Sequence, residues 1–264
     1  MTQEVTAPHV LVDFGDRGDT ESNMGDIALT TLELIGSAKQ VAGKAKDKFK
    51  TIMAMLSGNH DADINNHSFE SELFQRELFG KPIFLQYVGG YAVLAINTNF
   101  YSSFWRYNVS LERQKFDKLK EKRDSVVGEV DPQIDVQIER YVDFFGRIES
   151  EEKRQNELIQ EALQSGKKIA VLAHEEAQVI KHLPLDNSRI THIFAGHLHK
   201  PVDRDLKQKN KDGQNIRLVR VGTATATDTG VVWPKSYEIT ITGDNLEVQD
   251  LQIDQTSVDM PEYY

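Results

Sequence analysis

The sequence predicts an α/β protein, because short apolar runs alternate with stretches of helical periodicity. The apolar runs at 10–14, 51–56, 167–173 and 190–195 have the length and composition of buried strands. Apolar residues recur at helical spacing between them, most clearly over 110–164. A polar motif directly follows each of the four runs, a pattern typical of α/β sheets that bind ligands at the ends of their strands.

The composition is typical of a folded chain. Its 264 residues fit one large domain or two small ones, and 39% hydrophobic with 27% charged residues excludes wholesale disorder. No apolar run approaches the ~18 residues of a membrane-spanning helix, so no membrane partner is expected. The net charge of −10 makes nucleic acid an unfavourable partner, because phosphate contacts need clustered cations. A nuclease with a local metal site stays an alternative.

The chain has no cysteine, which excludes disulfides, cysteine–zinc sites and thiol catalysis. Its first eight residues contain no basic stretch followed by an apolar one, so no secretory signal is expected. We therefore expect a cytoplasmic location.

The N-terminal part of the chain is expected to contain four strands and two helices. Gly89-Gly90 separates two of the strands and is a hairpin signal. The expected strands are 10–14, 51–56, 83–88 and 91–96, and the expected helices are 23–42 and 68–79.

The C-terminal part begins with a long, charged helical segment over 110–164, which is broken at Asp131-Pro132. Strands at 167–173 and 190–195 follow. The remainder, 216–253, is β-rich, with turn signals at Asp212-Gly213 and Gly243-Asp244. Since no linker or repeat is evident, we expect a single domain over 1–264 with a helical insertion at about 101–165.

The polar motifs contain residue types that bind divalent metal ions. Carboxylate, amide oxygen and imidazole together suit Mn, Fe, Zn or Mg. His197 and His199 stand two residues apart, so both can share one face of a strand or bend from a loop toward neighbouring ions. Because the strand ends are expected to converge, the motifs predict one site. The candidate ligands are Asp16, Asn59, His174, His197 and His199.

Such ligands suit a phosphate-binding pair of ions. Two ions ~3.5–4 Å apart clamp a phosphate and lower the pKa of a shared water, and one aspartate can bridge them. His60 directly precedes Asp61, and a neighbouring carboxylate holds a histidine protonated and oriented. We expect His60 to act as general acid toward a leaving oxygen or as a cationic clamp on the phosphate. Helix capping by Asp16 and a turn at Asn59 are the plainer alternatives.

In order and spacing, the motifs resemble those of the calcineurin-like metallophosphoesterases. They are Gly15-Asp16-Arg17-Gly18-Asp19, Gly58-Asn59-His60-Asp61, His174 after a strand, and Gly196-His197-Leu198-His199. Gly-Asn-His-Asp is the most specific of them, and all four together are far more specific than any one alone. The resemblance covers 10–251. The segment 221–227 is also loosely similar to the C-terminal part of cyclic-nucleotide-phosphodiesterase-like members.

The resemblance implies a four-layer α/β/β/α sandwich of two mixed sheets. It implies two divalent ions and attack of a metal-bound hydroxide on a small phosphomonoester or phosphodiester. Asp16 would bridge the ions, with Asn59, His174 and His197 completing the second ion and His199 on the first. Asn59 and His60 would face the substrate, with Asp61 behind His60 and Asp19 supporting the Asp16 loop.

The chain departs from the family in one respect, because no Asp-x-His motif precedes Asp16. Only fifteen residues stand before Asp16, too few for the family's first strand, its loop and its helix. Three explanations stay open: a fragment or misassigned start, a partner chain that supplies the strand, or a degenerate member. The last would bind one ion or none, so a single-metal or non-catalytic binding scaffold is the alternative function.

Other residues have a structural interpretation beside a functional one. Arg17 suits either a phosphate contact or a solvated loop. Glu175 and Glu176 adjoin His174 and either support it or, as we expect, provide surface charge. Aromatic residues after the strand at 91–96 are expected to anchor the helical insertion rather than to line a pocket: Phe100, Tyr101, Phe104, Trp105 and Tyr107. His67, His182 and His192 match no motif, and no role is expected for them.

Overall fold

The computed structural model describes residues 10–13, 52–55, 83–126, 131–198, 200–221 and 236–251. Two short strands, β1 (Val10–Asp13) and β2 (Ile52–Met55), pair in parallel with Asp13 opposite Met55. Both strands were predicted, and the structure confirms them. The helices expected at 23–42 and 68–79 lie outside the described residues.

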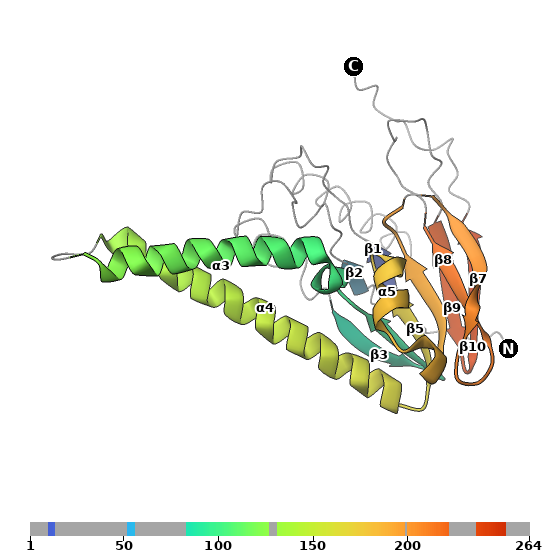
Figure 1. The fold of residues 1–264 in the computed structure, drawn as a ribbon. Helices are drawn as coiled ribbons and strands as arrows, with labels where there is room; N and C mark the ends of the chain where they lie inside the picture. The colour runs from blue at the N-terminus through green and yellow to red at the C-terminus, as the bar shows by residue number, and fades with distance from the viewer. Residues whose placement is uncertain are drawn as a thin grey trace, which may run out of the picture.

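The main sheet has six strands in the order β3-β4-β5-β6-β8-β7 (Figure 1). β4, β5, β6 and β8 are parallel to one another, and β3 and β7 are antiparallel strands at its two edges. The carboxyl ends of the four central strands therefore lie at one end of the sheet. The strands are β3 (Phe84–Val88), β4 (Tyr91–Ala95), β5 (Lys168–Leu172), β6 (Ile190–Ala195), β7 (Val202–Lys209) and β8 (Asn215–Arg220).

One face of this sheet packs against helices α4 (Pro132–Gln164) and α5 (Glu176–His182). Alternate residues of each strand point to this face, as the two-residue period of a strand requires. Burial of these aliphatic side chains removes apolar surface from water and holds the helices on the sheet. The core between this face and the helices includes Leu94, Val171, Ile193 and Leu218 from the strands and Leu158, Ile159, Ala162 and Val179 from the helices.

The other face is covered by the hairpin of β9 (Ser236–Thr242) and β10 (Asn245–Leu251). The turn of this hairpin docks on the turn between β3 and β4. The Gly90 amide donates to the Gly243 carbonyl at 2.7 Å, and Lys168 Nζ donates to the Asp244 carbonyl at 2.8 Å. The second core includes Tyr91, Ala95, Leu172, Phe194 and Val219 with Tyr237, Ile239, Ile241, Leu246 and Val248.

Helices α3 (Ser103–Asp124) and α4 form a hairpin that extends well beyond the sheet (Figure 1). The Asp131 side chain accepts from the Gln133 amide, and Pro132 begins α4, so the predicted break is confirmed. A separate aromatic cluster lies between the two helices and the segment before α3. Its buried members are Phe100, Trp105, Phe144, Phe145 and Ile148.

The expected anchoring role of the aromatic residues holds for some of them only. Phe100 and Trp105 are buried, and Tyr101 stacks on His182 with ring centroids 4.6 Å apart. Phe104 and Tyr107 are 40% and 61% exposed, so the expectation that they are core anchors was wrong. Both stand on the solvent side of the first turns of α3, where the buried position is Trp105.

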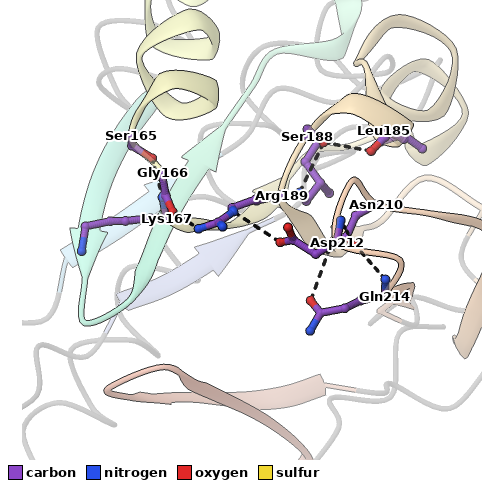
Figure 2. Close-up of polar contacts among 10 residues, drawn as sticks. Ser165, Gly166, Lys167, Leu185, Ser188, Arg189, Asn210, Asp212 and Gln214 are labelled. Carbon is purple, nitrogen blue, oxygen red and sulfur yellow. Dashed lines mark hydrogen bonds and ion pairs between the residues drawn. The ribbon is translucent and has the colours of Figure 1, made fainter.

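At the amino ends of β5 and β6, a polar network connects the loops that lead into the strands (Figure 2). Arg189 Nη1 donates to the Gly166 carbonyl, and Arg189 Nε lies 3.3 Å from an Asp212 carboxylate oxygen. Asn210 Oδ1 accepts from the amides of Asp212 and Gln214, both at 3.0 Å, and shapes the turn between β7 and β8. These contacts join the loops before β5 and β6 and the turn between β7 and β8. They lie at the end of the sheet opposite to the one at which the predicted motifs follow the strands.

The predicted α/β class is confirmed. Apart from the β1–β2 pair, the described residues form three layers: helices, the six-stranded mixed sheet, and the β9–β10 hairpin. The predicted strands at 83–88, 91–96, 167–173 and 190–195 are all present, whereas the charged strand β7 was not predicted. None of the helices in the described ranges is both long enough and apolar enough to cross a membrane.

Candidate functional site

Two of the predicted metal ligands meet at the carboxyl end of the sheet. His174 follows β5 and His197 follows β6, and these strands are parallel neighbours. His174 Nε2 lies 3.2 Å from His197 Nδ1, with the rings edge to face and their centroids 5.0 Å apart. His174 is 1% exposed, and His197 is partly buried. The structure thus brings together two imidazoles that are 23 residues apart in the sequence.

The backbone around the two histidines is tightly connected. The Gly196 amide donates to the His174 carbonyl at 3.1 Å, and the Ala173 amide donates to the Phe194 carbonyl at 3.0 Å. His197 itself has a φ of +41°, the left-handed region that residues with a Cβ rarely adopt. A strained backbone that its surroundings hold in place is a common feature of functional sites.

Buried polar groups that follow β4 support the same end of the sheet. Gln155 of α4 accepts from the Asn97 amide at 2.7 Å and donates to the Asn97 carbonyl at 3.3 Å. Thr98 Oγ1 accepts from the Glu175 amide at 3.3 Å, directly after His174. Sequence reasoning missed this support, although a signal was present: Asn97-Thr98-Asn99 follows an apolar run, as the metal-binding motifs do.

Glu176 was expected to provide surface charge, and this expectation was wrong. The residue is 7% exposed, and its carboxylate pairs with Arg220, the last residue of β8, which is also 7% exposed. A second guanidinium nitrogen of Arg220 donates to the Lys200 carbonyl at 3.2 Å. The pair was not recognisable from the sequence, because its members are 44 residues apart.

The separation of the two ring nitrogens fits a shared metal ion. Imidazole nitrogens bind zinc at about 2.0–2.1 Å, so two of them on one ion lie about 2.9–3.4 Å apart. A direct N–H···N hydrogen bond has the same length, with one neutral ring donating to the other. Imidazole suits Fe and Zn, two of the ions expected for this site, and the oxygen ligands expected from Asp16 and Asn59 suit Mn and Mg.

The remaining predicted site residues lie outside the part of the chain that the structure describes. They are Asp16, Arg17, Asp19, Asn59, His60, Asp61 and His199. The strands that precede two of the motifs are described: β1 ends three residues before Asp16, and β2 ends four residues before Asn59. Since β1 and β2 are parallel, both motifs follow the same end of this pair. Within the described ranges alone, no group of three His, Asp or Glu side chains could hold an ion.

The other two described histidines have different surroundings. His192 lies on β6 among the residues that face the β9–β10 hairpin, and its ring stacks on Phe194. Burial, aided by the positive charges of Arg217 and Lys168, lowers the pKa of His192 to about 4. His182 ends α5 and is exposed.

Comparison with known proteins identifies the family. No curated protein and no solved structure matches the chain. The match to a family model, described as calcineurin-like phosphoesterase, ends before the segment 221–227, so its looser similarity to cyclic-nucleotide phosphodiesterases stays a prediction. Residues 3–201, well over half of the chain, match this model, so the chain belongs to the calcineurin-like phosphoesterases, a family of metal-dependent phosphoester hydrolases.

Proposed function

We propose that this chain hydrolyses a small phosphomonoester or phosphodiester in a metal-dependent reaction. The observation that carries the proposal is the 3.2 Å contact between His174 Nε2 and His197 Nδ1 at the carboxyl ends of β5 and β6. Two imidazoles from separate motifs meet there at the separation expected of ligands to one ion. The chain's membership of a phosphoesterase family supports the same reaction.

In this proposal some residues bind the metal ions, and others contact the substrate or transfer a proton. His174, His197 and Asn59 would hold one ion, His199 would hold a second ion, and Asp16 would be shared between the two. Two bound divalent ions would neutralise the phosphate oxygens and lower the pKa of the attacking water. His60, oriented by Asp61, protonates the leaving alcohol oxygen, and Arg17 contacts a phosphate oxygen.

The net charge of −10 favours a small substrate over nucleic acid. A phosphate group needs only a local cationic centre, whereas a nucleic-acid chain needs positive charge along its whole path. We therefore expect no binding of duplex DNA at about 0.15 M salt. Cleavage of plasmid DNA at a rate comparable to that of aryl phosphodiesters would contradict this choice of substrate class.

The test measures metal content and turnover on the same preparations. The chain is loaded with Mn²⁺, passed through a desalting column and analysed for metal by elemental analysis. Hydrolysis of bis-p-nitrophenyl phosphate and p-nitrophenyl phosphate is then followed. We expect the wild-type chain to retain Mn²⁺ and to hydrolyse at least one of the two substrates. We expect His174→Asn to lose its bound Mn²⁺ and its turnover to fall by more than about 100-fold. Even a residue that only supports a metal ligand contributes about 10–100-fold to metal affinity or activity.

His182→Asn is the matched control. This histidine lies on α5, eight residues after His174, and is exposed, so its loss leaves metal content and turnover unchanged. A wild-type chain that binds no divalent ion and hydrolyses neither substrate would overturn the proposal. Unchanged turnover in His174→Asn would overturn the assignment of His174.

A further inference from the structure

A buried ion pair lies beside the two histidines and contacts both of their segments. Glu176 is the first residue of α5, two residues after His174. Its partner Arg220 ends β8, and β8 pairs with β6, the strand that leads to His197. The side chains of Arg220 and Glu176 are only 8% and 9% exposed, so the two charges are removed from water together.

The segment 196–200, which carries His197, is held by hydrogen bonds at its first and last residues. At its start, the Gly196 amide donates to the His174 carbonyl at 3.1 Å. At its end, the Lys200 carbonyl accepts from Arg220 Nη1 at 3.2 Å. Between these anchors His197 holds its left-handed φ of +41°, a conformation that the surroundings must maintain.

The ion pair is poorly explained as a source of stability. Glu176 Oε2 and Arg220 Nε are buried, and neither has a hydrogen-bond partner among the residues that the structure describes. A buried ion pair with such unsatisfied atoms loses much of its Coulomb energy to desolvation, and apolar residues of similar size often serve the fold equally well. What apolar residues cannot supply is the hydrogen bond to the Lys200 carbonyl.

We propose that Glu176 and Arg220 are positioning residues that set the geometry of the metal site. Glu176 orients the Arg220 guanidinium, and Arg220 holds the far end of the 196–200 segment, so that His197 stays within reach of His174. The proposal rests on the proposed function for its consequence, which is that the ion meets ligands already in place. Its structural part concerns the histidines alone and is measurable without metal.

The test uses two double variants and one matched control. Glu176→Leu with Arg220→Met replaces the pair by apolar residues. Glu176→Arg with Arg220→Glu rebuilds an ion pair but leaves no donor on residue 220 for the Lys200 carbonyl. The control, Asp203→Leu with Arg217→Met, removes a two-point ion pair three residues earlier on β8, between β7 and β8.

Three quantities are compared with the wild-type chain. The first is the melting temperature. The second is the set of imidazole NMR signals of His174 and His197 in the metal-free chain, assigned with His174→Asn and His197→Asn. The third is the affinity for Mn²⁺ by titration calorimetry. We expect both test variants to keep the wild-type melting temperature within a few degrees, to shift both imidazole signals, and to bind Mn²⁺ about 10–100-fold more weakly.

The control variant is expected to leave the imidazole signals and the Mn²⁺ affinity unchanged. Changes in both test variants and none in the control would support the positioning role of Glu176 and Arg220. Unshifted imidazole signals in both test variants would overturn the proposal, whatever happens to metal binding. Should the apolar variant fail to fold, the charge-swapped variant alone decides, and wild-type signals and affinity in it would overturn the proposal. Shifted signals in a chain whose wild type binds no ion would support positioning and overturn the proposed function instead.

Discussion

Tyr141 on α4 donates a hydrogen bond of 2.9 Å from its hydroxyl to Oε2 of Glu112 on α3, and this contact connects the two long helices. The other oxygen of Glu112 accepts from Lys115 at 2.6 Å, so both carboxylate oxygens are partnered although the residue is only 6% exposed. Since a buried carboxylate must keep its partners, the contact favours one register of the helical hairpin.

Tyr141→Phe is expected to destabilise the protein. The substitution keeps the ring, which packs on Phe116 and Phe145, but leaves Glu112 Oε2 without its donor. An unsatisfied buried acceptor lowers the free energy of unfolding by about 1–3 kcal/mol, which urea denaturation measures. Tyr107→Phe on the exposed side of α3 is the control and leaves the midpoint unchanged. Equal midpoints for the wild type and Tyr141→Phe would show that the contact contributes nothing.

The docking of two turns predicts a difference between two glycine substitutions. Gly89 has a φ of +53°, and a Cβ added there would lie 2.4 Å from the Gly243 carbonyl oxygen. Gly213 has a φ of +74° with open space around the added Cβ. Both alanine variants carry the cost of the left-handed backbone, but only Gly89→Ala also forces the turns apart.

We therefore expect Gly89→Ala to lose about 1–3 kcal/mol more unfolding free energy than Gly213→Ala, since overpacking adds that much. Urea denaturation of the two variants side by side measures the difference. Equal losses would mean that the β9–β10 turn does not depend on its contact with the β3–β4 turn.

Elements with a local signal were predictable from the sequence. The strand expected at 190–195 coincides with β6, because an apolar run between polar motifs has few alternatives. Gly89-Gly90 and Asp131-Pro132 were interpreted correctly, since their effect on the backbone is intrinsic to glycine and proline. The order of the motifs predicted that His174 and His197 would meet, and the sheet brings them together.

Features that depend on distant partners were not predictable. β7, with the sequence VDRDLKQK, is a charged edge strand whose pairing with β8 leaves no apolar pattern. Glu176 resembled a surface residue because nothing near it in the sequence indicates Arg220. The one local signal was Arg220 itself, a charged residue at the end of a strand whose preceding residues, Leu218 and Val219, are buried.

The surroundings of His192 predict a loss of stability in acid. The unfolded chain protonates this histidine below about pH 6.5, whereas burial, Arg217 and Lys168 lower its folded-state pKa to about 4. Between these values the unfolded state binds more protons, so the unfolding free energy falls as the pH falls from 6.5 to 4.

His192→Phe removes this titrating group and keeps a ring to stack near Phe194 and Tyr91. We expect its unfolding free energy, from urea denaturation at about pH 7 and about pH 4.5, to fall less than that of the wild type. His182→Asn is the exposed comparison and keeps most of the wild-type dependence. A wild-type slope in His192→Phe would show that His192 is not a source of the acid sensitivity.

Substitution of His197 by asparagine is expected to weaken metal binding and turnover without lowering the free energy of unfolding. The reason is the left-handed backbone of residue 197, which is costly for most residues. A residue with a Cβ in the left-handed region costs about 1–2 kcal/mol, and asparagine tolerates that region better than most residues. His197→Asn therefore keeps its unfolding free energy within about 0.5 kcal/mol of the wild type or raises it. Its affinity for Mn²⁺ and its turnover fall by more than about 100-fold, because an imidazole ligand is lost.

Leu198→Asn is the matched control for this substitution, since Leu198 is the next residue on the same turn and is 56% exposed. It changes neither the urea midpoint nor the Mn²⁺ affinity. Wild-type affinity in His197→Asn would remove His197 from the metal site. A large fall in the urea midpoint of His197→Asn would instead mean that the contact with His174 stabilises the fold. The left-handed turn at residue 197 would then be a structural feature and not one maintained for metal binding.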